Sequence, residues 1–286
     1  MLAGVVDYAG LYPPASLEID VAAENYARYR VGMHAWMLGR FVLPATKLGA
    51  LEAATWAGSF APGIPWHLSV VLASINEMAL VEENNSRAED GGPALVADAV
   101  EIRADSAAHI NAISDRRMPG VVVYVELPVT QDPVSLIESA GQAGLFAKVR
   151  SGGVTEDAFP SPENLVRFMR RCVEMAVPFK ATAGLHHPVR ASYPLTYQRG
   201  CAKGPMFGFL NVLLSVLLLR RGDSARALEA IREEDASSIR ADPESVSWRG
   251  TAFLTSEIAA ARRCFHSFGS CSFEEPVNEL LSLRLL

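Results

Sequence analysis

The sequence predicts a parallel α/β protein of the (β/α)8 TIM-barrel type, and three observations support this prediction. Six short runs of apolar, often β-branched residues alternate with helical stretches before residue 184. The runs are almost continuously apolar, as are strands of a parallel sheet that is buried on both faces. The length of 286 residues fits one α/β barrel, although it also fits two smaller domains. The expected strands are residues 41–43, 67–73, 99–103, 120–127, 145–150 and 177–183.

The stretches between these runs have the features of amphipathic helices. The clearest covers residues 161–176, where Ser161 is a natural N-cap and Pro162 suits the first helical turn. Apolar side chains then recur at helical spacing through this segment. Residues 51–56 and 133–143 are also expected to be helical. Alternating strands and helices indicate βαβ units and therefore a parallel sheet.

A closed barrel needs about eight strands, so two more must be found. Residues 265–273 are one candidate, and residues 5–8 or 239–248 are another. We expect a single barrel-like domain over residues 1–286, with an irregular loop-and-helix region at about 185–250 that leaves the barrel distorted or incomplete. An open doubly wound α/β sheet is the alternative. Residues 82–93 are polar and contain glycine, and we expect an exposed loop there.

Composition and charge narrow the classes of partner. The net charge is −6 and the basic residues form no long run, which argues against nucleic acid as a partner. The most apolar stretch, residues 206–219, is shorter than the roughly 20 residues that cross a bilayer, so we expect a buried helix and no membrane partner. The four cysteines form no C-x-x-C pair and no signal-peptide pattern is seen, which indicates reduced thiols and a cytoplasmic location. Assembly into a homo-oligomer is left open.

Two consecutive predicted strands end in lysine-containing polar segments. Reactive groups of barrels project from these carboxyl ends. Lys148 and Arg150 are two residues apart and share one strand face, and so do Lys180 and Thr182 on the next strand. Burial and a neighbouring cation both lower the pKa of a lysine, and a neutral lysine can attack a carbonyl or remove a proton. We therefore expect Lys180 and Lys148 to be catalytic.

Residues around these strand ends are suited to hold the anionic group of a small-molecule substrate. Arg150 supplies a cation, and the Ser-Gly-Gly sequence that follows it can bring backbone N–H groups close to an anion. The expected substrate is small, oxygenated and anionic, with a carbonyl group. The expected anion-binding residues are Arg150, Ser151, Gly152, Gly153, Thr182 and Arg190.

The segment Lys180-Ala181-Thr182-Ala183-Gly184 resembles the Lys-Thr-Ser-Thr-Gly strand end of deoxyribose-phosphate aldolase, a barrel family with a Schiff-base lysine. The resemblance is confined to these five residues, and position 181 is alanine rather than threonine. It implies that Lys180 is the Schiff-base lysine and that Lys148 or Arg150 is a neighbouring cation. That family has its second lysine on the strand after the Schiff-base strand, whereas Lys148 is on the strand before. The leading hypothesis is a lysine-dependent lyase of the aldolase type.

Two adjacent histidines after this strand support a second hypothesis. His186 or His187 is expected to act in catalysis as an acid or base. With Glu126 they could instead bind a divalent ion such as zinc, as in a metal-dependent hydrolase or isomerase. The spacing matches no zinc motif, so no cofactor is favoured. The candidate partners of such a site are Glu126, Glu101, His67 and Glu274.

Other polar residues have simpler interpretations. Glu126 ends its strand and can pair with Lys148 on the neighbouring strand, which could be structural or could tune the lysine. Residues 7–14 are expected to cover one end of the barrel. Cys271 is expected to be a structural thiol, because no base can be assigned to it. A third hypothesis follows, in which the protein is a non-catalytic, barrel-like binding protein whose lysines simply pair with acids.

Overall fold

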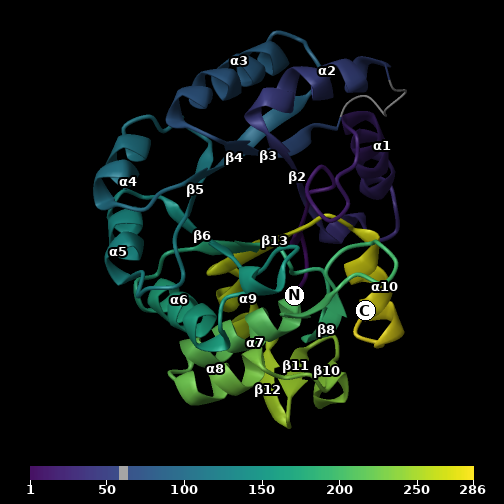
Figure 1. The fold of residues 1–286 in the computed structure, drawn as a ribbon, viewed down its shortest axis with the longest axis vertical. Helices are drawn as coiled ribbons and strands as arrows, with labels where there is room; N and C mark the ends of the chain where they lie inside the picture. Colours follow the sequence, from purple (N-terminus) through teal and green to yellow (C-terminus); the bar gives the residue numbers. More distant parts are fainter. Residues whose placement is uncertain (58–63) are drawn as a thin grey trace.

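In the computed structural model, which describes residues 1–57 and 64–286, eight parallel strands close into a barrel (Figure 1). The strand order is β1-β13-β7-β6-β5-β4-β3-β2, and pairing of β1 with β2 closes the ring. The prediction of a (β/α)8 barrel is confirmed, and the barrel is complete rather than an open sheet. The barrel strands are β1 (Val6–Tyr8), β2 (Leu38–Pro44), β3 (Trp66–Leu72), β4 (Leu95–Arg103), β5 (Val122–Glu126), β6 (Phe146–Arg150), β7 (Phe179–Thr182) and β13 (Phe265–Ser270).

Helices surround the barrel and bury its outer face (Figure 1). The expected helices correspond to α2, α5 and α6, and Ser161 caps α6 by accepting a hydrogen bond from the N–H of Asn164 at 3.2 Å. The helices are α1 (Ile19–Arg30), α2 (Leu48–Ala57), α3 (Met78–Glu89), α4 (Ala107–Ser114), α5 (Val134–Gln142), α6 (Pro162–Glu174), α7 (Phe209–Arg220), α8 (Ser224–Ile231), α9 (Thr255–Arg262) and α10 (Glu274–Ser282).

The prediction of an exposed loop at residues 82–93 is wrong over most of this segment, because α3 continues to Glu89. The polar residues serve the helix rather than breaking it. The buried amide of Asn84 donates to the carbonyl of Leu95 at 2.8 Å, which ties α3 to the start of β4. Arg87 and Glu83 form an ion pair one helical turn apart, at 2.7 Å. Such pairs stabilise an exposed helix face by a few tenths of a kcal/mol.

The chain between β7 and β13 forms the irregular region that the sequence indicated. A hairpin of β8 (Ala191–Pro194) and β9 (Lys203–Met206) comes first, followed by α7 and α8. β10 (Ile239–Ala241), β11 (Ser245–Trp248) and β12 (Thr251–Leu254) then form a separate antiparallel sheet. Residues 239–248 therefore lie outside the barrel, whose remaining strands come from the two chain ends as β1 and β13.

The apolar stretch at residues 206–219 is explained by α7, whose residues 209–219 are all buried. It lies between other helices (Figure 1) rather than on the surface. Nowhere in the described part of the chain is a helix both long and apolar enough to cross a bilayer.

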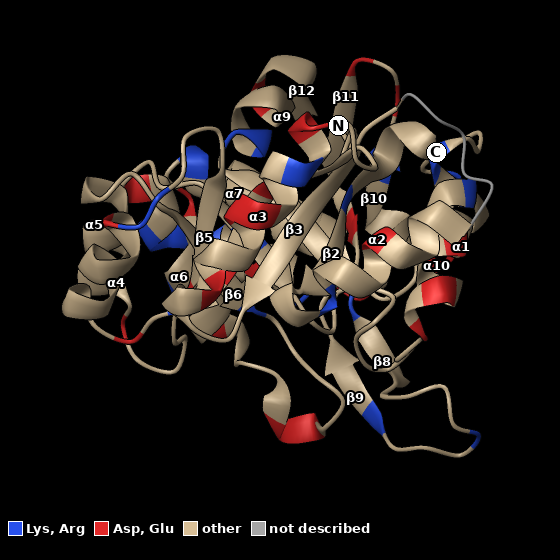
Figure 2. Ribbon diagram, turned by 90° about the horizontal axis from the view of Figure 1, so that it is seen from above, with Lys and Arg blue, Asp and Glu red and all other residues tan. Residues whose placement is uncertain are grey.

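The β8–β9 hairpin projects beyond the end of the barrel toward which the strand arrow of β3 points (Figure 2). This is the carboxyl end of the parallel strands. Lysine, arginine, aspartate and glutamate are interspersed over the ribbon in this view. The hairpin is held by Tyr193, whose ring stacks on that of His187 at a centroid distance of 3.4 Å. The hairpin thus stands beside the end of the barrel where barrel enzymes have their active sites.

Replacing Ser161 by alanine should lower the free energy of unfolding by about 1 kcal/mol, because the N–H of Asn164 loses its acceptor at the start of α6. Urea denaturation measures the change. The matched control is Ser282→Ala, since Ser282 is exposed and its hydroxyl bonds only within its own helix. A loss in the control as large as that in Ser161→Ala would contradict the capping role.

Candidate active site at the carboxyl end of the barrel

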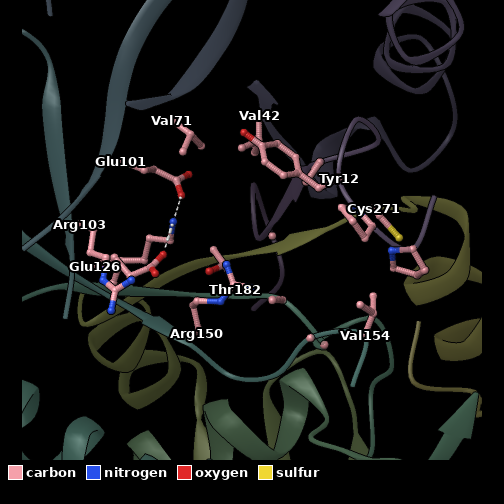
Figure 3. A pocket seen from close by; sticks show the side chains of 18 of the residues that line it. Tyr12, Val42, Val71, Glu101, Arg103, Glu126, Arg150, Val154, Thr182 and Cys271 are labelled. Carbon is pink, nitrogen blue, oxygen red and sulfur yellow. Dashed lines mark ion pairs between the residues drawn. The ribbon is translucent and has the colours of Figure 1, made fainter. Parts of the chain in front are cut away.

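A pocket of about 350 Å³ opens at the carboxyl end of the barrel (Figure 3). Every barrel strand, or the residue just after it, contributes to its lining. Five charged side chains line it: Glu101, Arg103, Glu126, Lys148 and Arg150. Apolar wall is provided by Pro13, Pro14, Val42, Val71, Leu72, Ile102 and Val154. A pocket with apolar walls and a few convergent polar groups is the usual form of a small-molecule site.

A continuous chain of ion pairs crosses the barrel interior and ends in this pocket. Lys180 Nζ lies 2.6 Å from Asp7 Oδ2 and 2.6 Å from Glu101 Oε1. The second oxygen of Glu101 lies 2.7 Å from Lys148 Nζ, which in turn lies 2.8 Å from Glu126 Oε2. We call these five alternating charges, Asp7–Lys180–Glu101–Lys148–Glu126, the charged ladder. The expected pairing of Glu126 with Lys148 is confirmed.

Strand register explains why the charged ladder forms. Glu126 pairs with Lys148 across β5 and β6, and Lys148 pairs with Lys180 across β6 and β7. Parallel strands in register place side chains at one level of the barrel, and side chains pointing inward must meet at its axis. Two neighbouring lysines at one level require anions, which Asp7 on β1 and Glu101 on β4 supply.

The inner part of the charged ladder is sealed from solvent, and its carboxylates accept further hydrogen bonds, including one from the N–H of Arg40 to Asp7 Oδ1 at 2.9 Å. Asp7, Glu101 and Lys180 are exposed by 1% or less. Ser69 donates to Glu101 Oε1 and Ser267 donates to Asp7 Oδ2, each at 2.7 Å. Buried charges are tolerated when they are paired and their remaining lone pairs are hydrogen-bonded, as they are here.

The pKa values of this inner part follow from its pairing. Burial alone would lower the pKa of Lys180, but the carboxylates of Asp7 and Glu101 outweigh it and raise that pKa above its ordinary value. Burial would likewise raise the pKa of Glu101, but the ammonium groups of Lys148 and Lys180 outweigh it and hold that pKa well below its usual range. The expectation of a lowered pKa for Lys180 is therefore wrong, because its nearest neighbours are carboxylates and not a cation.

The two candidate lysines differ in their access to the pocket. The side chain of Lys180 is 0% exposed and lies below the pocket, which it does not line. The side chain of Lys148 is 7% exposed and lines the pocket, together with the 17% exposed side chain of Glu126. Lys148 is therefore the amine that a ligand in the pocket can reach.

Two arginines at the pocket rim provide positive charge. Arg150 lines the pocket as the sequence indicated, on the same strand face as Lys148. Arg103 lies beside it in the same way, two residues after Glu101 on β4, and sequence reasoning did not single it out. A sequence pattern could have identified Arg103, because Glu101 precedes it by two residues just as Lys148 precedes Arg150. Within residues 1–57 and 64–286, neither guanidinium forms an ion pair.

Two hydroxyl groups on the pocket wall are buried without a hydrogen-bond partner among the described residues, Tyr12 Oη and Thr182 Oγ1. Thr182 was expected at the site. Tyr12 belongs to the segment 7–14 that was expected to cover one end of the barrel, and it does lie at this end. A buried hydroxyl without a partner costs about 1–3 kcal/mol. Both groups are therefore suited to a ligand that supplies the missing hydrogen bonds.

The remaining expected anion-binding residues are used differently. Ser151 donates its N–H to the carbonyl of Thr182 at 2.8 Å and its hydroxyl to that of Ala183 at 2.8 Å, so it joins β6 to β7 rather than facing a ligand. Gly152 is needed for close packing, because a Cβ there would lie 2.3 Å from the ring of Phe159. Gly153 lines the pocket.

Arg190 is also engaged elsewhere. It lies in the long segment after β7, forms an ion pair with Glu234 at 2.6 Å and does not line the pocket. Its guanidinium also lies 6.0 Å from the ring centroid of Phe207. The structure therefore brings together Lys148, Glu126, Arg150, Gly153, Thr182 and His186 at the pocket, and leaves Arg190 outside it.

The two histidines point to different surroundings. His186 lines the pocket, and its Nδ1 lies 3.1 Å from Ser270 Oγ. Burial, with a smaller effect of His187, lowers the pKa of His186 to about 4, so it is neutral at pH 7. His187 instead pairs with Glu279 of α10 at 2.6 Å. Among the described residues, no three histidine, cysteine or carboxylate side chains are grouped to hold a metal ion.

Cys271 also lines the pocket, and its environment is now defined. Its Sγ lies 3.4 Å from Tyr197 Oη and 3.7 Å from His186 Nδ1, a neighbour that the sequence did not reveal. Burial raises the pKa of the Cys271 thiol. A protonated thiol beside a neutral histidine fits the structural role that we expected.

Comparisons with known proteins add little to this geometry. No family model matches the chain, and no curated protein matches its sequence. A FabK mutant from Thermotoga maritima matches among solved structures, with 18% identity and a TM-score of 0.37. The match covers 65% of this chain and 55% of that chain, so about half of the FabK chain is matched. The barrel assignment rests on the strand pairing described above, and no aldolase is matched.

Replacing Lys180 by methionine should lower the free energy of unfolding by about 3–5 kcal/mol, because Asp7 and Glu101 would lose a buried counter-ion. Adding Asp7→Asn should recover part of this loss, since one buried charge is removed. Chemical denaturation of the single and double variants measures both effects. If Lys180→Met is as stable as wild type, the result would favour the third hypothesis, in which the protein is non-catalytic and its lysines simply pair with acids.

Stability should fall as the pH drops below about 6.5. The pKa of His186 is lowered to about 4 in the folded state, so the unfolded chain binds a proton there that the folded protein does not. His186 does not lower the free energy of unfolding above about pH 6.5, which is the pKa of histidine in the unfolded chain. The free energy of unfolding then falls as the pH drops toward 4, by about 2 kcal/mol at pH 5. The contribution of His186 to the slope of the free energy of unfolding against pH should vanish in His186→Gln. It should be retained in His109→Gln, because His109 is exposed on α4. An unchanged slope in His186→Gln would contradict the assignment.

Proposed function

We propose that the protein is a lysine-dependent lyase of the aldolase type, in which Lys148 forms an imine with the carbonyl group of a small substrate. One observation supports this most strongly: Lys148 is the lysine of the charged ladder that lines the pocket, whereas Lys180 is sealed below it. The imine role thus moves from Lys180 to Lys148.

Glu126 is suited to move the protons of imine formation. A lysine attacks a carbonyl only as the neutral amine, so a nearby base must accept the ammonium proton. Glu126 lies 2.8 Å from Lys148 Nζ and lines the pocket. Glu101 has a pKa well below its usual range, so it stays ionised and holds Lys148 in place. Glu126 takes the proton, Nζ attacks the carbonyl carbon, and the oxygen leaves as water when Glu126 returns the proton.

Lys180 assists this chemistry through its fixed charge. It shares the carboxylate of Glu101 with Lys148, so its positive charge opposes a positive charge on Lys148 Nζ. The positive charge of Lys180 also repels the positive charge of the protonated imine. This repulsion is relieved when a substrate C–C bond breaks, because the electron pair of that bond neutralises the imine nitrogen. A charge that favours the transition state over the ground state accelerates the step.

The substrate's own proton must also be accounted for. In retro-aldol cleavage the hydroxyl next to the breaking bond becomes a carbonyl, and its proton passes to a base. The Glu126 carboxylate, free again after water has left, can accept it. The aldehyde fragment leaves, and Glu126 gives the proton it has accepted to the carbon of the remaining enamine. Hydrolysis of the resulting imine then returns Lys148 to its amine. Each carboxylate and amine required for this cycle is already present in the charged ladder.

Imine formation can be tested by borohydride trapping with a panel of small aldehydes and 2-oxo acids. The chain has only four lysines, Lys47, Lys148, Lys180 and Lys203, so peptide mapping can identify the modified one. We expect a reduced adduct on Lys148 in the wild type and none in Lys148→Ala. The control Lys203→Ala, which removes an exposed lysine on β9, should trap as the wild type does.

The location of the adduct decides between the two lysines. An adduct on Lys180 would overturn the assignment, and trapping that persists undiminished in Lys148→Ala would do the same. Glu126→Gln should still fold and should slow trapping while leaving the adduct on Lys148, because it retains the shape of the side chain but cannot accept a proton. Equal trapping rates for Glu126→Gln and wild type would exclude Glu126 as the base.

A further inference from the structure

Positive charge is in excess at the mouth of the pocket. The charged ladder contains three carboxylates and two ammonium groups, which leaves one negative charge. Arg103 and Arg150 add two positive charges at the rim, and neither has an ion-pair partner within the described residues. The seven groups together carry one net positive charge, which a bound monoanion would neutralise. Neutralisation of this kind favours binding most where water is partly excluded.

The two arginines approach Lys148 from both sides. Arg103 on β4 pairs in register with Glu126 on β5, which pairs with Lys148 on β6. Arg150 follows Lys148 by two residues on the same strand face. Adjacent strands are about 4.8 Å apart, so β4 and β6, which flank β5, are roughly 10 Å apart. The long side chains of two arginines can span this distance to hold one small anion between them. Figure 3 shows Arg103, Glu126 and Arg150 together on one side of the pocket. An anion bound there lies next to the amine of Lys148.

The rest of the pocket has a different character. Tyr12, Val154 and Cys271 lie away from the arginines (Figure 3), and Pro13 and Pro14 complete this apolar part. The hydroxyl group of Tyr12 is buried there without a hydrogen-bond partner among the described residues. The hydroxyl group of Thr182, which also has no such partner, lies beside Arg150 in the strand register. The volume of about 350 Å³ is near the lower end of the range for small-molecule pockets. A fitting ligand is therefore small and has one charged end and an apolar body.

A carboxylate fits the charged end better than a phosphate ester does. Two guanidinium groups suit a planar carboxylate. Phosphates are usually held by several free backbone N–H groups as well. In the Ser-Gly-Gly turn the N–H of Ser151 is not available to a phosphate, because it is bonded to the carbonyl of Thr182, and the ring of Phe159 packs against Gly152.

We infer that the pocket binds a 2-oxo carboxylate with an apolar side chain, and this inference rests on the proposed function. The carboxylate binds between Arg103 and Arg150, which places the adjacent 2-oxo carbon at Lys148 Nζ. The apolar side chain extends toward Pro13 and Val154. A 2-oxo acid places the anion one bond from the carbonyl, as the proximity of the arginines to Lys148 requires.

The inference can be tested by calorimetric titration with N-isobutyloxamate, a carboxylate whose amide carbonyl does not form an imine. Wild type should bind it. Arg103→Met and Arg150→Met should each bind about tenfold more weakly or worse, because each loses a charge-assisted hydrogen bond. The matched control is Arg199→Met, which removes an exposed arginine from the β8–β9 loop and should bind as wild type does. The neutral diamide of the same shape should not bind.

Several results would overturn the inference. These are absence of binding to wild type, equal binding of the neutral diamide, unchanged affinity in both arginine variants, or tighter binding of inorganic phosphate at the same site. The test is independent of the proposed chemistry. If oxamate binding requires both arginines but no carbonyl compound is trapped on Lys148, the ligand class stands and the lyase proposal fails. If neutral aldehydes are trapped on Lys148 and the arginines have no effect, the lyase proposal stands and the ligand class fails.

Discussion

The rest of the structure depends on the neutralisation of two lysines inside a closed barrel. Barrel interiors are usually filled by branched apolar side chains, but this one holds Lys180 between Asp7 and Glu101 with almost no exposure. Removing Lys180 leaves the buried carboxylate of Asp7 without its ion-pair partner, which is strongly destabilising. The strands must therefore stay in the register that joins β1, β4, β6 and β7 through their side chains. The same constraint fixes the position of Lys148 at the floor of the pocket.

The charged ladder also separates structural from reactive groups along one axis. Its inner end, Asp7 and Lys180, is sealed and hydrogen-bonded, whereas Glu101, Lys148 and Glu126 border the pocket. A site is best held when the groups beneath it are themselves rigid. The fold supplies a fixed cation and a fixed carboxylate, and in the reaction that we propose only Lys148 and Glu126 exchange protons. The role that we propose for Arg103 and Arg150 is to determine which end of a ligand meets that pair.

Much of the fold was predictable, because parallel strands buried on both faces leave continuous apolar runs such as residues 67–73 and 120–127. The final two strands were harder to assign, since β1 has only three residues and β13 is separated from β7 by a long insertion. The site was predictable where local spacing determined it, as for Lys148, Arg150 and Glu126. It was not predictable where long-range pairing decides: Asp7 lies 173 residues from Lys180 in sequence, yet it raises the pKa that we expected to be lowered. No local sequence pattern reveals the register of the strands, and this register determines which lysine lines the pocket.

The central claim is that one lysine is sealed and the other is open. Acetic anhydride labelling of the native protein, with mass spectrometry of all four lysine peptides, tests it most directly. The account predicts rapid labelling of the exposed Lys47 and Lys203, slower labelling of Lys148, and none of Lys180 until the protein is unfolded. Labelling of Lys180 in the native protein at the rate of Lys148, or protection of Lys148 as complete as that of Lys180, would contradict it.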